Sequence, residues 1–106
     1  MEKAFQALAS VVRRRILAYL SASSMTAGEI AERFEISKPS LSKHLGILVN
    51  AGFIVGEKKG QYIHYSLVQE NITSTLYGFI QEVCPASRSL KKESRAKSAG
   101  KTEGCN

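Results

Sequence analysis

The chain has 106 residues, of which 43% are hydrophobic, so it can form one domain with a modest core. Its 15 Lys and Arg residues outnumber its 9 acidic residues, and the net charge of +6 suits a polyanionic partner. No apolar run approaches the roughly 18 residues that span a bilayer, no signal peptide is evident, and two cysteines are too few for a disulfide scaffold. These features argue against a membrane protein and a disulfide-rich secreted domain, and we expect a cytoplasmic protein.

The first segment, residues 2 to 20, is expected to be helical. Its apolar residues recur every three or four positions, at Phe5, Leu8, Val12, Ile16 and Leu20. Ser10 is placed to cap a second helix within the segment. Three consecutive arginines, residues 13 to 15, point three ways around a helix, so at most one or two of them can face a DNA backbone.

A short second helical segment follows a small polar loop at residues 21 to 24. Thr26 and Glu29 have the spacing of a capping box, in which each side chain accepts a hydrogen bond from the other residue's backbone amide. Ile30 and Phe34 continue an apolar stripe with a spacing of four residues. The pattern predicts a helix that ends near Phe34.

The stretch from Ile36 to Leu48 predicts a longer helix with a buried face. Ser37 is a good N-cap, and Pro39 is tolerated in the first turn, where its missing amide proton would have no partner. The buried stripe is formed by Leu41, Leu45 and Leu48. The helix is expected to end at residues 50 to 52, where Gly52 supplies a left-handed cap.

The other face of this helix carries groups that suit DNA. Ser40 and Lys43 lie opposite the leucines, with Ser42 and His44 on the two shoulders, and all four are short donors or cations that can reach phosphates and base edges. Taken alone, the pattern fits a solvated surface helix equally well. The preceding short helix and tight turn complete a helix-turn-helix, which favours DNA.

After Gly52 the periodicity changes to two, which predicts a β-hairpin. Residues 53 to 57 and 62 to 67 are expected to be the strands, joined by a basic turn at residues 58 to 61. One face of the second strand, with Ile63, Tyr65 and Leu67, is expected in the core. The tip side chains could touch DNA beside the recognition helix, or could simply form a charged, soluble turn. After a helix-turn-helix, a DNA-contacting wing is the favoured interpretation.

A last helix is predicted from Gln69 to Val83, where Pro85 stops it. It carries a broad apolar stripe, and a core of this size cannot easily cover both that stripe and the apolar face of the first helix. Packing of both within one chain is the alternative. We favour a two-fold dimer whose interface is formed by Phe5, Leu8, Ile72, Leu76, Phe79, Ile80 and Val83.

The expected organisation is therefore one domain, residues 1 to 85, for DNA binding and dimerisation. Its fold class is mainly α with a small β-hairpin: a winged helix-turn-helix with about five helices and a two-stranded antiparallel wing. Residues 86 to 106 hold 6 Lys and Arg against 2 Glu and lack periodic apolar residues. We expect this segment to be a disordered basic tail.

Residues 5 to 67 resemble the ArsR/SmtB family of bacterial winged-helix repressors. The resemblance is carried by Phe5-Gln-Ala-Leu8, by Arg13-Arg-Arg-Ile-Leu17, by Thr26-Ala-Gly-Glu-Ile-Ala31, by Ile36-Ser-Lys-Pro-Ser-Leu-Ser-Lys-His-Leu45, by Ala51-Gly52 and by Gly60-Gln-Tyr-Ile-His-Tyr-Ser-Leu67. It implies a homodimer joined through the first and last helices, which binds a palindromic operator and represses nearby genes, often its own.

The chain departs from the family pattern at two places. Val11-Val12 stands where many members have Asp-Pro, so the break between the first two helices is less clear. The cysteine pair of metal-sensing members, near positions 29 to 34, is absent, as are the His and carboxylate ligands in the last helix. His44 and His64 are not clustered, so we predict no metal and no cofactor. The chain most resembles the SdpR-like members, which lack that metal site.

The predicted function is a sequence-specific, homodimeric transcriptional repressor, and not an enzyme, located in the cytoplasm with the nucleoid. The residues expected to contact double-stranded DNA are Ser37, Lys38, Pro39, Ser40, Ser42, Lys43, His44, Lys58, Lys59, Gln61 and Arg14. One alternative is a winged-helix interaction module whose last helix docks an unidentified protein. Another is a thiol or soft-metal sensor that uses Cys84 and Cys105.

Overall fold

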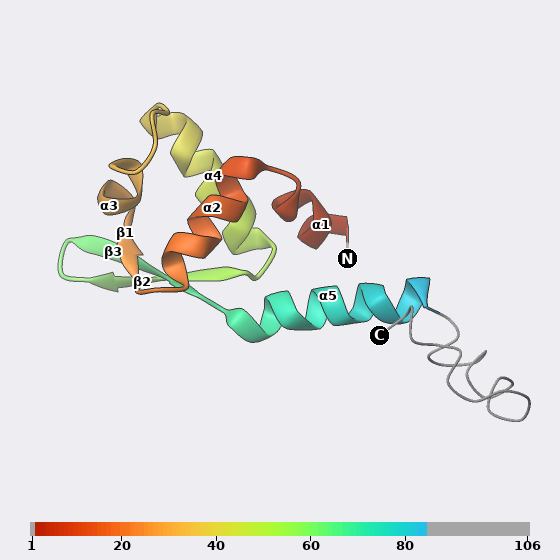
Figure 1. The fold of residues 1–106 in the computed structure, drawn as a ribbon. Helices are drawn as coiled ribbons and strands as arrows, with labels where there is room; N and C mark the ends of the chain where they lie inside the picture. Colours follow the sequence, from red (N-terminus) through yellow and green to blue (C-terminus); the bar gives the residue numbers. More distant parts are fainter. Residues whose placement is uncertain (1, 85–106) are drawn as a thin grey trace, which may run out of the picture. The chain divides into compact units, whose positions relative to one another are not determined.

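The computed structural model describes residues 2 to 84 and shows a winged helix-turn-helix (Figure 1). The elements in chain order are α1 (Glu2–Leu8), α2 (Val11–Leu20), β1 (Met25–Thr26), α3 (Ala27–Ala31), α4 (Lys38–Asn50), β2 (Ile54–Lys59), β3 (Tyr62–Leu67) and α5 (Gln69–Val83). The described residues divide into two compact units, one ending at Ile72 and the other beginning at Thr73, so the division falls within α5. The predicted fold class, five helices and an antiparallel wing, is confirmed.

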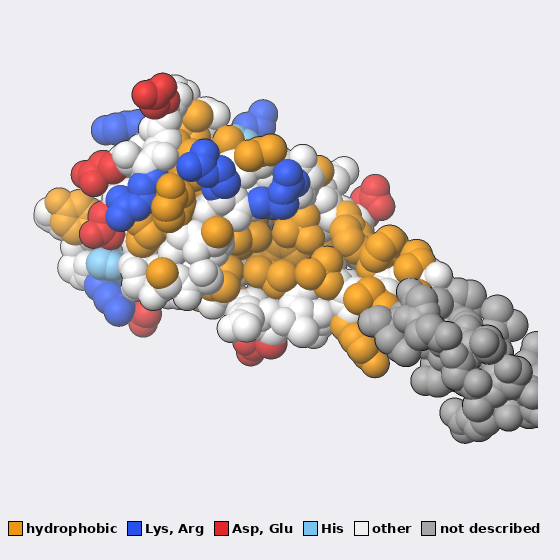
Figure 2. Space-filling model, in the orientation of Figure 1, with side chains coloured by type: hydrophobic (Ala, Val, Ile, Leu, Met, Phe, Trp, Pro, Cys, Tyr) orange, Lys and Arg blue, Asp and Glu red, His pale blue; other side chains and the backbone are white. Residues whose placement is uncertain are grey.

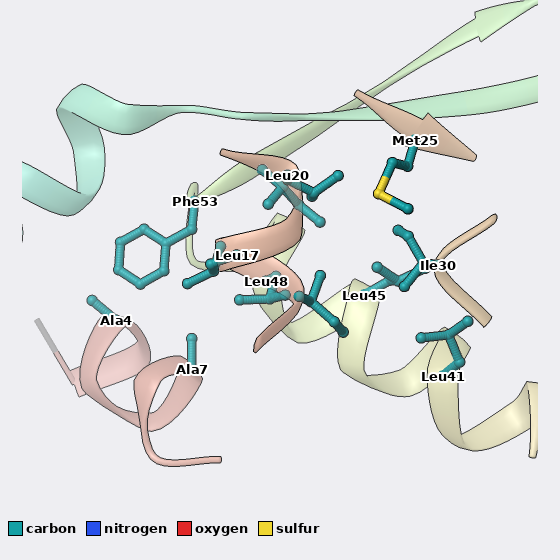
Figure 3. Packing of buried hydrophobic residues seen from close by; sticks show 12 residues of the cluster. Ala4, Ala7, Leu17, Leu20, Met25, Ile30, Leu41, Leu45, Leu48 and Phe53 are labelled. Carbon is teal, nitrogen blue, oxygen red and sulfur yellow. The ribbon is translucent and has the colours of Figure 1, made fainter. Parts of the chain in front are cut away.

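The core of the first unit lies between the helices and the sheet (Figure 3). α4 contributes Leu41, Leu45 and Leu48, as its spacing predicted, and these side chains are buried. The remaining members are Ala4, Ala7, Ile16, Leu17, Leu20, Met25, Ile30, Phe53 and Ile54. Burial of one complete face of α4 leaves its opposite face to solvent, and this arrangement creates the candidate site.

Local capping explains where the helices begin. The Ser10 hydroxyl accepts a hydrogen bond from the Arg13 amide, which starts α2 without the Asp-Pro pair of many relatives. Both hydrogen bonds of the predicted capping box are present between Thr26 and Glu29. Ser37 caps α4 through the amide of Ser40. All three predicted caps are confirmed.

The prediction that the short helix α3 reaches Phe34 is wrong, because α3 ends at Ala31. The Glu32 amide still bonds a carbonyl four residues back, but the amides of Arg33 and Phe34 bond carbonyls three residues back, so the chain tightens into a turn. The Phe34 ring instead meets Tyr19 of α2 edge to face, with ring centroids 5.8 Å apart. This contact explains why an apolar residue stands at position 34, where it continued the helical spacing from Ile30 although the helix has already ended.

The sheet has three strands rather than the predicted two, in the order β1-β3-β2, and all neighbours are antiparallel. The missed strand β1 is only two residues long and pairs Met25 with Tyr65 and Thr26 with His64. Two residues cannot display an alternation of period two, so the sequence gives no local signal for this strand. The Met25 side chain is buried in the core, so β1 connects the core to the base of the wing through its pairing with β3.

The wing, strands β2 and β3, turns at Gly60, whose φ of +66° is one that glycine adopts readily. Lys58 and Lys59 belong to β2 rather than to the predicted turn. The expectation that Ile63 is in the core is wrong, because its side chain is 45% exposed. It pairs with Lys58 in the outer half of the hairpin, whereas Tyr65 and Leu67, nearer the base, pack against the core.

The predicted bounds of α5 are confirmed, and none of its residues is buried. Its exposed apolar side chains are Leu76, Tyr77, Phe79, Ile80 and Val83. Such side chains are visible along α5 in Figure 2. Ile72, in the first unit, is half-buried and packs against the core. The predicted basic tail lies outside the described residues.

Candidate nucleic-acid interface

The helix-turn-helix consists of α3, the turn at residues 32 to 37, and α4. The N-cap at Ser37 fixes where α4 begins, and its hydroxyl accepts from the Ser40 amide at 3.2 Å. Other amides of the first turn have no partner within the helix, and together with the helix dipole they favour an anion. Lys38, at the first helical position, is exposed and adds a positive charge there.

The face of α4 opposite the leucines is open to solvent. Lys43 and Ser42 are exposed, as are Ser37, Lys38 and Pro39 at the start of the helix, whereas Ser40 and His44 are half-buried. None of the seven residues predicted to contact DNA from this helix is buried. This geometry suits a helix that inserts into a groove while its leucines hold it to the core.

Gly46 lies on the same exposed side, three residues beyond Lys43, and was not among the predicted site residues. A Cβ atom added here would meet nothing within 4 Å. Glycine inside a helix costs about 1 kcal/mol relative to alanine, and no packing among the described residues requires it. Its effect is a gap in the side-chain surface of α4. The spacing of three residues from Lys43 could have placed Gly46 on the exposed side from the sequence alone.

His44 differs from its neighbours because its ring is already bonded within the chain. Its Nδ1 lies 3.1 Å from Nη1 of Arg13 in α2. A guanidinium only donates, so Nδ1 accepts, and the neutral ring carries its proton on Nε2. Partial burial, followed by the positive charges of Arg13 and Lys43, lowers the pKa of His44 below its usual 6.5. His44 is therefore a neutral donor at neutral pH, not a cation.

The three arginines of α2 point three ways, as expected. Arg13 donates to two carbonyls of α1, from Nη2 to Gln6 at 2.7 Å and from Nε to Ala7 at 2.9 Å. Arg14 is exposed, and its Nη1 donates to the Leu8 carbonyl at 2.6 Å.

The third arginine, Arg15, lies over the ring of Phe34, with its guanidinium carbon 5.4 Å from the ring centroid. Of the three, Arg14 is the residue predicted to face DNA. The face shown in Figure 2 has Lys and Arg side chains spread over the helices, with acidic side chains among them near α3.

The wing presents the other predicted contacts. Lys58, Lys59 and Gln61 are all exposed. Lys58 is paired with Ile63 and Lys59 with Tyr62, so the two lysines lie on opposite faces of the hairpin. Within residues 2 to 84, no three His, Cys, Asp or Glu side chains lie close enough to hold a metal ion.

These features define a DNA-binding regulator of the winged helix-turn-helix class, and comparison with known proteins identifies the family. Residues 8 to 57 match the helix-turn-helix domain family HTH_20. Over 67 residues the chain is 52% identical to the transcriptional repressor SdpR of Bacillus subtilis (strain 168), covering 63% of this chain and 74% of SdpR.

Two solved structures share the fold. The crystal structure of the ArsR family transcriptional regulator RHA00566 superimposes with a TM-score of 0.70 at 31% identity, covering 76% of this chain and 89% of that one. The homodimeric winged helix-turn-helix domain Mb0332 of Mycobacterium bovis superimposes with a TM-score of 0.63 at 22% identity, covering 81% of this chain and 79% of that one. The chain belongs to the ArsR family of winged helix-turn-helix transcriptional repressors. The predictions of this family, and of a regulator rather than an enzyme, are confirmed.

In the part of the chain that the structure describes, none of the helices is both long enough and apolar enough to pass through a membrane.

Proposed function

We propose that two copies of this chain bind a palindromic operator and repress the genes beside it, with one α4 in the major groove of each half-site. The observation that carries this proposal is the division of α4 into a face buried through three leucines and an open face with Ser42 and Lys43. A helix held in this way can enter the groove without disturbing the core. Binding to chromosomal DNA would place the protein in the cytoplasm, at the nucleoid.

The proposed contacts have two kinds. Side chains of α4 read base edges and nearby phosphates, and the wing and Arg14 bind the backbone. They are Ser37, Lys38, Pro39, Ser40, Ser42, Lys43 and His44 on α4, Lys58, Lys59 and Gln61 on the wing, and Arg14 on α2. His44 would act as a donor through Nε2, because its Nδ1 is engaged by Arg13.

The proposed dimer interface uses α5 and α1. α5 has no buried residue in the single chain, and Leu76, Phe79 and Ile80 form an apolar stripe with a helical spacing. Mb0332, which shares the fold, is a homodimer. On α1 the proposed residues are Phe5 and Leu8, both half-buried, and Leu8 also packs against the core. Val83 and Ile72 complete the proposed set, although Ile72 already contacts the core of its own chain.

The decisive experiment is selection of duplexes from random-sequence DNA with the full-length protein. We expect an inverted repeat to be enriched, with half-sites about one helical turn apart, as a two-fold dimer requires. The enriched duplex then serves as the operator in every comparison below. Recovery of no preferred sequence would rule out the proposed function.

A Lys43→Ala variant should bind this operator about tenfold more weakly while remaining folded. Lys43 faces away from the buried leucines, so truncating it removes a DNA-binding group without disturbing the packing. Binding is measured by fluorescence anisotropy and helix content by circular dichroism. Wild-type affinity in this variant would contradict the proposed orientation of α4, and a weakened helical signal would mean that its buried face has been misassigned.

Replacing both Lys58 and Lys59 by alanine should weaken binding about equally on the operator and on unrelated DNA. The wing is expected to bind phosphates, and each phosphate that is no longer neutralised should reduce the slope of log affinity against log salt by roughly 0.9. Anisotropy titrations at several salt concentrations measure that slope. A weakening restricted to one base pair of the operator would show direct base reading by the wing instead.

Zinc, cadmium and arsenite should leave the protein on its operator. The ligand sets of metal-sensing relatives are absent at the matching positions, and the remaining thiols are Cys84 and Cys105, of which only Cys84 is among the described residues. The complex is titrated with each metal and with a mild oxidant, beside a Cys84→Ser/Cys105→Ser double variant. Release that occurs in the parent but not in the double variant would identify a thiol sensor.

A further inference from the structure

Arg13 connects three helices through a single side chain. Its guanidinium, carried by α2, donates to the carbonyls of Gln6 and Ala7 in α1 and to Nδ1 of His44 in α4, at 2.7, 2.9 and 3.1 Å. Hydrogen bonds from an ionised donor are stronger than those between neutral groups. The residue therefore joins the proposed dimerisation helix directly to the recognition helix.

We propose that Arg13 is a positioning residue that sets the orientation of α4 relative to α1, and through it the spacing of the two recognition helices in the dimer. The proposal rests on the proposed function, because it needs a dimer that reads two half-sites. It assigns a role to a side chain that is not among the proposed DNA contacts.

The chemistry at the α1 end favours an arginine. The last carbonyls of a helix have no partner within it, and the negative end of the dipole attracts a cation. α1 carries no basic residue in its own last turn, so Arg13 supplies that charge from α2. The rigid fork of the guanidinium can serve two carbonyls and a ring nitrogen at once, whereas a lysine ammonium is a point charge.

The chemistry at the α4 end depends on the state of His44. Its Nδ1 can accept from Arg13 only while the ring is neutral, and this fixes the proton on Nε2. The lowered pKa of His44, caused by partial burial and by the nearby charges of Arg13 and Lys43, favours this neutral form. The same bond that orients α4 therefore also sets which donor His44 can offer to DNA.

Apolar packing between α1 and α4 is slight, so the hydrogen bonds of Arg13 can determine how the two helices are oriented. The buried side chains of α1 are only Ala4 and Ala7. Farther along the two helices, a pocket opens between them and is lined by Lys3, Gln6, Ile47 and Asn50. Small side chains and a gap restrain rotation weakly, so the hydrogen bonds of Arg13 have a large share in fixing the helix pair.

The test compares full-length Arg13→Ala with Arg15→Ala, which removes an equal charge from the same helix but lies over Phe34. Arg13→Ala should lose about tenfold in operator affinity and less than twofold on unrelated DNA, while sedimenting as a dimer. It should also discriminate less between the operator and a duplex whose half-sites are one base pair farther apart. Arg15→Ala should stay within twofold of the wild type in every assay.

Two further measurements separate positioning from general stability. Arg13→Lys keeps the charge but not the fork, so it should remain weaker than wild type on the operator. Nitrogen NMR of His44 should show the Nε2–H form in the wild type, and in Arg13→Ala the pKa of His44 should rise, because a neighbouring positive charge is gone.

Each other outcome has a definite meaning. Wild-type operator affinity in Arg13→Ala, an equal weakening on all DNA, or dissociation of the dimer would each overturn the positioning role. Full recovery by Arg13→Lys would also overturn it, since charge alone would then be sufficient. A wild-type protein without any sequence preference would instead refute the proposed function, so the two failures are distinguishable.

Discussion

A Phe79→Glu variant is expected to sediment as a monomer and to bind the operator at least 100-fold more weakly than the wild type. Phe79 is 43% exposed and lies within the apolar stripe of α5, so in the proposed dimer its ring would be buried against the second copy. A carboxylate at that place would lose its hydration without gaining a partner. Without the dimer, each half-site is bound separately, and linkage of two sites contributes roughly 10² to 10⁴ in affinity.

The matched control for this variant is Ser74→Glu, which places the same charge on the exposed opposite side of α5. It should remain a dimer with operator affinity close to that of the wild type. Mass is measured by sedimentation velocity at the concentrations used for DNA binding, because dimer content depends on concentration. If Phe79→Glu kept both mass and affinity, the interface would have to lie elsewhere.

The helices were predictable because their determinants are local. The capping hydroxyls of Ser10, Thr26 and Ser37 act within three residues, and the spacing of the α4 leucines directly specifies a buried face. The exposed side of α4 follows from the same count, which is why Lys43 could be placed opposite the core. The departure from the Asp-Pro pattern at residues 11 and 12 did not prevent a second helix, since α2 begins at Val11 behind the Ser10 cap.

The features that sequence reasoning missed depend on tertiary pairing. Strand β1 exists because Met25 and Thr26 lie beside β3, about forty residues away, and not through any pattern of its own. The alternation of β3 correctly puts Ile63 on the face of Tyr65, but it cannot say how far along the strand the core extends. That limit depends on the helices beneath the hairpin.

In the candidate site too, the features with local determinants were predictable, and those that depend on tertiary contacts were not. The accessible residues of α4 could be identified by counting around the helix, but the bond between Arg13 and His44 joins residues 31 positions apart. Helical geometry predicts that the three arginines point in different directions, but it does not predict which residues each of them contacts. One of them, Arg13, is bonded to both α1 and α4.

A Phe53→Ala substitution is expected to lower the free energy of unfolding by about 3–5 kcal/mol, the range for truncating a buried phenylalanine. Phe53 is fully buried, and its ring points towards the side of α1 that carries Ala4 and Ala7 (Figure 3). Its backbone amide donates to the Leu48 carbonyl, and its carbonyl accepts from the Val68 amide. The cavity would therefore open where α4, β2 and the segment leading into α5 converge.

Because a small domain has only about 5–15 kcal/mol of stability in total, this destabilisation should shift the midpoint of urea unfolding strongly. The control is Val55→Ala, two residues further along in β2, where the side chain is 52% exposed and the change should be within about 0.5 kcal/mol. Both variants are unfolded at one protein concentration and followed by circular dichroism. A decrease below about 1 kcal/mol for Phe53→Ala would mean that α1 collapses onto the vacated space, and that this end of the core is held by the polar bonds of Arg13 more than by packing.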